Sequence, residues 1–548
     1  MTCLRRISVA STVALMVAAF GAFGAETLGD HTVRVRLTAK QSEITFRAPE
    51  DLSLIWEDAE RFLPAGTYSI RVSGVTAAKQ RFHLFIKTFR PSEANEAREY
   101  IARWKQQGYE PELVTFGKRL HTESHRVIDE RSLWVSLARL DSVEKAASLK
   151  TKLEKQDVSG WIVPETIQRG KGMLSIAPVP KLNLGTSKSG KTSAKTPIPA
   201  RIRCTRAVEV KNIDFGFWRP QRANRTYSGE LEVAVGPDGL LEMYETLPVE
   251  DYLAGVLPAE MPAAWPVEAI KAQAVSARSE VISSMAGKHI LEGFNFCGTE
   301  HCRAYLGAGG REKATDRAVA ETHGMVLVTG ERVVPTVFSA NCGGWTEDNE
   351  SVWSAPPNSA LRGVPDFPDE GRSADSARSQ VQLGNERHEW LTKGLQEPGM
   401  SKWLRTKPPA YCCAEPDNFR WVRRFTAREL SDIVNRKYPI GNIRGIELGD
   451  RGAGGRLKWV KIVGGKGTQV VRKELNIRLA FGGLNSAMFI IDVDGKKGEP
   501  TSFTFIGGGR GHGVGLCQDG ARARALAGAG FEEILKHYFS RSDVVRMQ

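Results

Sequence analysis

LPVEDYLAGVLPAEMPAAWPVEAIKAQAVSARS, residues 247–279, is the most informative stretch of this chain. Proline suits the first position of a helix and little else in it, so Trp265-Pro266 predicts that a helix begins there. The residues before this start predict a loop. That loop would deliver one carboxylate, Glu260, to the mouth of the helix.

Glu260 is the candidate catalytic residue because its near neighbours Leu257, Met261 and Trp265 are apolar. Apolar surroundings raise the pKa of a carboxyl group by penalising its charged form, and a general acid that works near neutral pH needs such a pKa. Spacing alone leaves a second interpretation open, in which Glu260 is a solvated loop residue.

Three separated blocks carry a family signature: VLPAEMPAAWPVEAIKAQAVSAR (256–278), VFSANCGGWTEDNESVW (337–353) and GGGRGHGVGLCQDGA (507–521). In this order they resemble the stage II sporulation protein D (SpoIID/LytB) family, whose members act on bacterial peptidoglycan. The resemblance covers about half of the chain. It implies an α+β fold with a SpoIID-like catalytic domain.

The resemblance also implies a peptidoglycan lytic transglycosylase with Glu260 as its acid and base. The acid would protonate the leaving GlcNAc oxygen, and the carboxylate would then take the proton of the MurNAc C6 hydroxyl as that oxygen closes on C1. Ordinary hydrolysis needs two carboxyl groups. Because the family includes proteins described as amidase enhancers, a non-catalytic peptidoglycan-binding protein or an enhancer of an N-acetylmuramoyl-L-alanine amidase is the alternative.

Further residues of the three blocks are candidates for binding the glycan. They are Lys271, Gln273, Arg278, Ser339, Gly343, Gly344, Thr346, His512 and Gln518. The resemblance implies that the third block lines the cleft and that His512 and Gln518 contact substrate or orient Glu260. For the charged members an ordinary surface role is the alternative, and for His512 a structural hydrogen bond.

Residues 81–165 predict a separate unit with the element order strand, helix, strand, strand, helix, strand. The expected elements are 82–89, 92–107, 112–116, 133–140, 142–154 and 160–163. This layout resembles a SPOR domain, the module that recognises glycan strands stripped of stem peptides.

The two faces of this predicted sheet differ in character. Strand alternation points Leu84, Ile86, Leu133, Val135 and Leu137 at the helices, and it points His83, Phe85, Lys87, Phe89 and Trp134 the other way. Phe85 and Trp134 would then contact sugar rings. Because apolar patches are often interfaces, burial of this face by another segment is the alternative.

The remaining organisation follows from composition. Residues 1–25 predict a secretory signal peptide, with Arg5 and Arg6 before an uncharged run, and an uncleaved N-terminal membrane anchor is the alternative. Alternating patterns predict strands over 31–75, and the resemblance implies that they form the front β-module of the SpoIID-like domain. A flexible linker is expected at 169–200, and the catalytic domain is expected to continue over 201–548.

A secretory signal would make the protein secreted, periplasmic or associated with the cell envelope. The formal net charge of +13 favours acidic partners. In that compartment the abundant polyanion is the cell wall, so peptidoglycan glycan strands are the expected partner, together with a cell-wall amidase in the alternative function. Nucleic acid is not an expected partner.

Seven cysteines follow the predicted signal peptide. Cys297, His301 and Cys302 lie within six residues and predict three ligands of a structural zinc site, with His289 or water as the fourth. A Cys297–Cys302 disulfide explains the same thiols without metal. A disulfide between Cys342 and Cys517 would join two of the family blocks.

Overall fold

The protein is described from a computed structural model that covers residues 31–179, 193–216, 221–287, 289–353, 355–368 and 399–548. The fold is mixed α+β with more strand than helix. The expected signal peptide or anchor at residues 1–25 lies outside the described residues. Within the described ranges, no helix is both long enough and apolar enough to cross a membrane.

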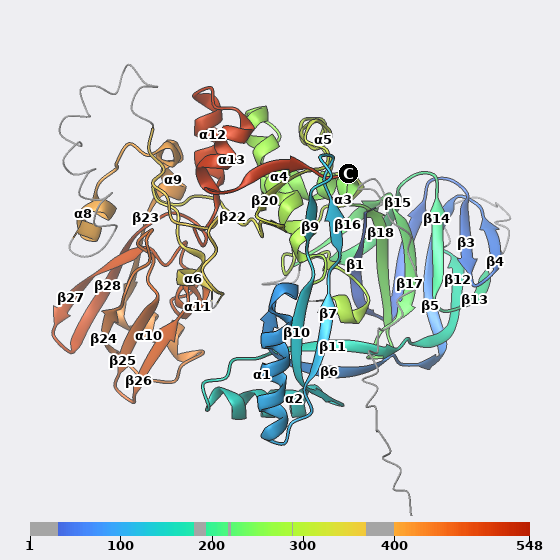
Figure 1. Cartoon of the computed structure of the whole chain (residues 1–548), viewed down its shortest axis with the longest axis horizontal. Helices are drawn as coiled ribbons and strands as arrows, with labels where there is room; N and C mark the ends of the chain where they lie inside the picture. Colours follow the sequence, from blue (N-terminus) through green and yellow to red (C-terminus); the bar gives the residue numbers. More distant parts are fainter. Residues whose placement is uncertain (1–30, 180–192, 217–220, 288, 354, 369–398) are drawn as a thin grey trace, which may run out of the picture.

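Two sheets, both mainly antiparallel, share one core at one end of the molecule (Figure 1). The seven-stranded sheet has the order β19 (Phe296–Cys297), β1 (Thr32–Gln41), β18 (Leu241–Pro248), β17 (Glu230–Val235), β14 (Ala200–Cys204), β3 (Leu52–Trp56), β4 (Ala59–Leu63). The six-stranded sheet has the order β13 (Ala194–Pro197), β12 (Lys171–Pro178), β5 (Gly66–Thr76), β2 (Glu43–Ala48), β15 (Val208–Asp214), β16 (Arg222–Tyr227).

Strands from residues 31–75 interleave with strands that follow residue 200. β1 pairs with β18, β2 with β15 and β3 with β14. Alternating side chains of β1 are buried, among them Val33 and Val35, because one face of the strand meets the core. The front β-module therefore shares both sheets with the later part of the chain.

A smaller unit is inserted between β5 and β12, which pair with each other. Its elements are β6 (Lys79–Phe89), α1 (Ala94–Gln106), β7 (Glu112–Phe116), β10 (Ser132–Leu140), α2 (Val143–Glu154) and β11 (Trp161–Gln168), with a hairpin of β8 (Arg119–His121) and β9 (Val127–Asp129) between β7 and β10. The sheet order β11-β6-β10-β7 is that of a ferredoxin-like βαββαβ layout.

The predicted linker at 169–200 is wrong for residues 171–178 and 194–200. They form β12, β13 and the first residue of β14, because their alternating apolar side chains, such as Leu174 and Ile176, face the core. Residues 180–192 of that prediction lie outside the described part of the chain.

Side-chain alternation in the inserted unit is confirmed for most positions. Leu84, Ile86, Leu133, Val135 and Leu137 all pack in the cluster that includes residues of α1 and α2. Phe89 was expected on the opposite face, and that is wrong, since its ring packs against Tyr100 of α1 at 5.7 Å between centroids. The pairing of β6 with β10 is irregular around Ser136, which breaks the strict two-residue period.

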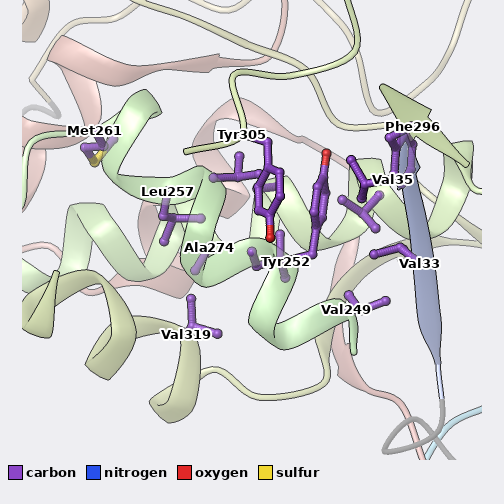
Figure 2. Close-up of a cluster of buried hydrophobic side chains, with 14 of the residues drawn as sticks. Val33, Val35, Val249, Tyr252, Leu257, Met261, Ala274, Phe296, Tyr305 and Val319 are labelled. Atoms are coloured by element: carbon purple, nitrogen blue, oxygen red, sulfur yellow. The ribbon is translucent and has the colours of Figure 1, made fainter. Parts of the chain in front are cut away.

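The predicted loop before Glu260 is instead a helix. Val249, Tyr252, Leu253, Val256 and Leu257 recur at helical spacing and are buried, so α3 (Val249–Glu260) forms against the core (Figure 2). Glu260 is its last residue. The next helix, α4 (Val267–Ser284), begins after Pro266 as predicted, and most of its residues are buried.

A separate core lies at the other end of the molecule (Figure 1). It is built from the sheets β23-β28-β27 and β24-β25-β26 with two helices. The bounds are β23 (Arg420–Thr426), α10 (Ala427–Asn435), β24 (Ile443–Leu448), β25 (Trp459–Gly464), β26 (Thr468–Arg472), α11 (Glu474–Ala480), β27 (Phe489–Lys496) and β28 (Glu499–Gly508).

Short elements connect the two ends around α3 and α4. They are η3 (Ile290–Glu292), η4 (Ala308–Gly310), α5 (Lys313–Glu321), β20 (Met325–Thr329), β21 (Arg332–Val333), β22 (Phe338–Ser339), α6 (Asn349–Val352), α8 (Gly399–Arg405), η6 (Tyr411–Ala414), α9 (Pro416–Phe419), β29 (Leu516–Cys517), α12 (Gln518–Leu526), α13 (Phe531–Tyr538) and β30 (Asp543–Arg546).

Candidate functional site

The Glu260 side chain is half-buried at the C-terminal end of α3. Burial raises its pKa to about 7, and the nearby carboxylate of Glu280 acts in the same direction. The negative end of a helix dipole also disfavours a carboxylate at this position. Among the described residues, no hydrogen bond or ion pair engages its carboxylate, so a proton held there is available to a ligand.

Gln518 joins the third family block to Glu260. Its Nε2 donates to the backbone carbonyl of Glu260 at 2.9 Å and to Oε1 of Gln273 at 3.3 Å. Gln273 is completely buried on α4, and its Nε2 has no hydrogen-bond partner within the described part of the chain. The structure thus brings together three of the predicted site residues.

Sequence reasoning missed an ion pair beside Glu260. Glu280 on α4 accepts from Nε of Arg303 at 2.9 Å and lies 2.8 Å from its Nη2. Glu280 follows Gln273 by seven residues, which is two helical turns, and this shared face was a usable signal. The pairing with Arg303 gives the Glu280 carboxylate a structural partner that Glu260 lacks.

Glu245 shows that a raised carboxyl pKa alone does not mark the site. Burial also raises its pKa to about 7. Glu245, however, is completely buried and accepts hydrogen bonds from the Gly229 amide and the Tyr305 hydroxyl, each at 2.8 Å. Glu260 differs because its side chain is only half-buried and its carboxylate has no hydrogen-bond or ion-pair partner among the described residues.

Lys271 and Arg278 do not join the site. Arg278 is completely buried, its Nη2 lies 2.6 Å from Glu250, and its Nη1 donates to the carbonyl of Met325 at 3.1 Å, which excludes it as a glycan contact. Lys271 contacts Glu268 at 3.0 Å and Glu321 at 2.6 Å. The prediction of a substrate contact is wrong for Arg278, whereas for Lys271, whose side chain is 17% exposed, it stays a prediction.

The second and third blocks meet through β22 and β29, which place Ser339 beside Cys517. Ser339 is buried and accepts from the Gly513 amide at 3.1 Å. Thr346 is also buried, and its hydroxyl accepts from the Val364 amide at 2.8 Å. We call the packed second and third family blocks, residues 337–353 and 507–521, the wall of the site, and Gln518 belongs to it. The hydroxyls of Ser339 and Thr346 form hydrogen bonds inside this wall.

Gly343 and Gly344 have positive φ angles of 80° and 101°. A Cβ atom on Gly344 would lie 2.7 Å from the Trp403 ring, and one on Gly343 would lie 3.0 Å from the Gly509 amide nitrogen. The glycines thus allow close packing of the wall rather than contact with a ligand.

His512 lies in the same wall with its ring 5.0 Å from that of Trp353. Its Nδ1 accepts from the Val514 amide at 3.1 Å. Burial, followed by the nearby Arg456 charge, lowers the pKa of His512 to about 3, so the imidazole is neutral at physiological pH. It is therefore unsuited to act as a general acid there.

His289, Cys297, His301 and Cys302 form a candidate metal centre, with ligand atoms that all lie within 4.8 Å of one another. The His301 Nδ1 lies 3.5 Å from the Cys297 sulfur and 3.7 Å from that of Cys302. Nδ1 of His289 is held by Glu292 at 2.6 Å, while its Nε2 is buried without a partner within the described ranges. Ligand histidines usually have such a carboxylate behind them, so the residues fit zinc. The seven described cysteines are free, including Cys342 and Cys517.

The aromatic face of the inserted unit is covered rather than open. Phe85 is completely buried against Trp134, at 5.2 Å between ring centroids, and against Trp161. Ile290 and Leu291 of η3 pack on the same cluster. The prediction of Phe85 as a sugar contact is therefore wrong, because the segment after α4 buries this face. Trp134 remains half-buried.

Comparisons with known proteins support the resemblance. Residues 238–328 match the family described as Stage II sporulation protein (SpoIID), and residues 347–515 match a domain of unknown function (DUF8618). The amidase enhancer of Bacillus subtilis is 28% identical over 304 residues, 52% of this chain and 39% of that protein. The chain thus spans well under half of that relative.

Two further relatives match over more of their own length. Stage II sporulation protein D of Bacillus subtilis is 25% identical over 319 residues, 55% of this chain and 75% of that protein. An uncharacterized protein of Brachyspira hyodysenteriae is 28% identical over 325 residues, covering 58% and 72% of the two chains. Together with the matched family, these similarities show that the chain carries a SpoIID family domain, within which Glu260 lies.

Proposed function

We propose that this protein is a peptidoglycan lytic transglycosylase that cleaves the β-1,4 bond between MurNAc and GlcNAc. The observation that carries the proposal is the state of Glu260. Its side chain is half-buried, its pKa is raised to about 7, and no described side chain forms a hydrogen bond or ion pair with its carboxylate. A group that is protonated near neutral pH and free to donate suits general acid catalysis.

In the proposed reaction Glu260 gives its proton to the glycosidic oxygen, and the bond from that oxygen to MurNAc C1 breaks. The Glu260 carboxylate then accepts the proton of the MurNAc C6 hydroxyl while the C6 oxygen bonds to C1. The products are a GlcNAc end with a free hydroxyl and a 1,6-anhydromuramyl end. Glu260 returns to its protonated state, and no water is consumed.

Gln518 supports this role through the backbone of Glu260. Its hydrogen bond to the Glu260 carbonyl ties the end of α3 to the start of α12. A fixed backbone keeps the carboxyl group aligned through both proton transfers, which catalysis by one residue requires. Gln518 is a positioning residue in this proposal.

Two other carboxyl groups act on the pKa of Glu260, those of Glu280 and, more weakly, the exposed Glu300. Glu280 is held by Arg303 at 2.8 Å. Hydrolysis by a carboxyl pair would need Glu280 or Glu300 as its second group, and it would give reducing muramic ends in place of anhydromuramyl ends.

The test is digestion of purified glycan strands with the wild-type protein and with Glu260→Gln. We expect 1,6-anhydromuramyl ends from the wild type and a loss of at least 100-fold in the variant, as for removal of a general acid. Glu321→Gln is the matched control, because Glu321 is an exposed carboxylate on α5. Cleavage by Glu260→Gln at the wild-type rate would contradict the assignment.

The name of one relative, the amidase enhancer, favours a second candidate. In that function the chain binds peptidoglycan and increases the activity of an N-acetylmuramoyl-L-alanine amidase without cutting glycan. Unchanged strands, together with faster release of stem peptides when a cell-wall amidase is added, would select this function over the first.

The cluster at His289, Cys297, His301 and Cys302 is proposed to hold a structural zinc ion. Bound there, the metal would fix the segment that supplies Arg303, the partner of Glu280.

The chain is further proposed to be secreted or attached to the cell envelope, with the inserted βαββαβ unit as a SPOR-like glycan-binding module. Of the two predicted sugar contacts, Trp134 is the one that remains, since it is half-buried.

A further inference from the structure

We propose that Cys342, Asp366, Cys412 and Cys517 form a second metal site that binds zinc, separate from the histidine-containing cluster. Their four ligand atoms lie within 4.8 Å of one another. All four side chains are buried, with at most 1% of any of them exposed. Residues 175 positions apart in sequence thus converge on one point in the interior.

The distances suit a shared metal ion. The sulfurs of Cys342 and Cys412 are 3.6 Å apart, and the Cys342 sulfur is 3.8 Å from Oδ2 of Asp366. Two thiolates bound to one tetrahedral zinc at about 2.3 Å each are separated by about 3.8 Å. A disulfide holds its sulfurs at about 2.05 Å. The cysteines are therefore arranged as neighbouring ligands.

The surroundings of Asp366 leave one oxygen for the cluster. Its Oδ1 accepts from the Tyr538 hydroxyl at 2.7 Å and from Arg524 at 3.2 Å. Its Oδ2 accepts from the Cys412 amide at 3.1 Å and faces the Cys342 sulfur. Outer partners of this kind orient ligating carboxylates in metal sites.

A backbone amide and an arginine lie beside the sulfurs. The Cys342 amide donates to the Cys517 sulfur at 3.2 Å. Near the cluster lies the guanidinium of Arg420, which donates to the backbone carbonyls of Gly343 at 3.2 Å and Trp403 at 3.0 Å.

Charge also favours a divalent cation. With zinc bound, three thiolates and one carboxylate would carry four negative charges in the interior, and an uncompensated buried charge is very costly. Arg524 lies 3.2 Å from Asp366, and Arg420 donates to the Gly343 carbonyl next to Cys342, so two positive charges lie beside the cluster. A zinc ion supplies the other two, so the occupied site is neutral with its two arginines.

The site would brace the wall that positions Glu260. Cys342 and Cys517 come from the second and third family blocks, and Cys412 comes from η6. Cys517 directly precedes Gln518, which holds the Glu260 carbonyl. A metal here would cross-link segments that are distant in sequence immediately behind Gln518.

Metal content of the full-length protein tests the site without using activity. We expect two zinc ions per chain in the wild type, and one in each of the double variants Cys297→Ser/Cys302→Ser and Cys342→Ser/Cys412→Ser. Cys413→Ser is the matched control, because Cys413 adjoins Cys412 but belongs to neither cluster, and it should keep two. Loss of zinc from Cys342→Ser/Cys412→Ser no greater than from Cys413→Ser overturns the proposal.

Native mass spectrometry of the wild type provides a readout that does not depend on the folding of variants. A mass with two zinc ions that falls to the fully reduced apoprotein mass after chelation supports the site. A mass without zinc, or a chelated mass two hydrogens lighter with Cys342 in a disulfide peptide, overturns it. If one zinc ion is present, the metal content of the two double variants shows which cluster holds it. Because no glycan is present, failure here leaves the proposal for Glu260 untouched.

Discussion

Glu260 and Glu245 are two carboxyl groups with pKa values raised to about 7 by burial, and only one of them is free to react. Glu245 is completely buried and hydrogen-bonded to Tyr305. Glu260 keeps part of its side chain exposed and its carboxylate unengaged. A perturbed pKa indicates function only when the geometry leaves the group accessible.

The activity should therefore depend on pH through the protonated form of Glu260. We expect kcat/KM for glycan strands to fall about tenfold per pH unit above a pH of about 7, because the acid must hold its proton in the free enzyme. The measurement is the initial rate of anhydromuramyl formation between pH 5 and 9. A rate that rises from pH 7 to 9 is incompatible with Glu260 as the acid.

The same shift predicts how Glu260→Gln changes stability. The pKa of Glu260 rises from 4.5 to about 7 on folding, so its contribution to the free energy of unfolding is fully present below pH 4.5 and is lost as the pH rises through about 7. Glutamine cannot ionise. The free energy of unfolding of the variant should therefore exceed that of the wild type by about 1–3 kcal/mol at pH 8, and by much less at pH 4.5.

Urea unfolding at the two pH values measures this difference. An equal difference at pH 4.5 and pH 8 would show that the pKa of Glu260 is ordinary in the folded protein.

The sequence predicted the raised pKa from the apolar neighbours Leu257 and Met261. It did not reveal Arg303 and Glu280 beside Glu260, because their approach depends on how α4 packs against the segment after Cys302.

At the scale of elements, α3 and α4 are joined by a buried ion pair between Glu250 and Arg278. Arg278 was predicted to bind glycan because it shares a helical face with Lys271. The two residues differ in burial, because Arg278 is completely buried and the Lys271 side chain is 17% exposed. The start of α4 was predictable from Pro266, whereas the end of α3 at Glu260 was not, because Pro258 in its last turn reads as a helix breaker.

Arg278→Met should lower the free energy of unfolding by about 3–5 kcal/mol, because it leaves Glu250 without its buried partner. Lys271→Met is the matched control. Its ion pairs with Glu268 and Glu321 are more exposed, and we expect a change of about 0–1 kcal/mol. Unfolding in urea measures both free energies. An Arg278→Met variant that is as stable as the wild type but no longer binds glycan would contradict this account and support Arg278 as a glycan contact.

At the scale of the molecule, the inserted unit docks on the SpoIID family domain through aromatic side chains that include Phe85. The sequence predicted its element order and the face that meets its helices. It did not predict the cover by Ile290 and Leu291, because nothing in local alternation specifies which distant segment packs on a sheet. For the same reason the sequence did not predict the cluster of Cys342, Asp366, Cys412 and Cys517, whose members come from distant segments.

Leu291→Asp should loosen this docking, since it places a charge against the cluster around Phe85. We expect faster hydrogen exchange in η3 and β11, and a larger radius of gyration by small-angle X-ray scattering. Val422→Asp is the matched control, because Val422 is 64% exposed. Unchanged exchange and size in Leu291→Asp would mean that the inserted unit is not held by this contact.

Transglycosylation by a single carboxyl group is the central claim, and the fate of water tests it most directly. Purified glycan strands are digested in water enriched in oxygen-18, and the new muramyl ends are weighed by mass spectrometry. The claim predicts ends that are lighter than reducing muramic acid by one water and carry no heavy oxygen. Reducing ends labelled with oxygen-18 would show hydrolysis and contradict it.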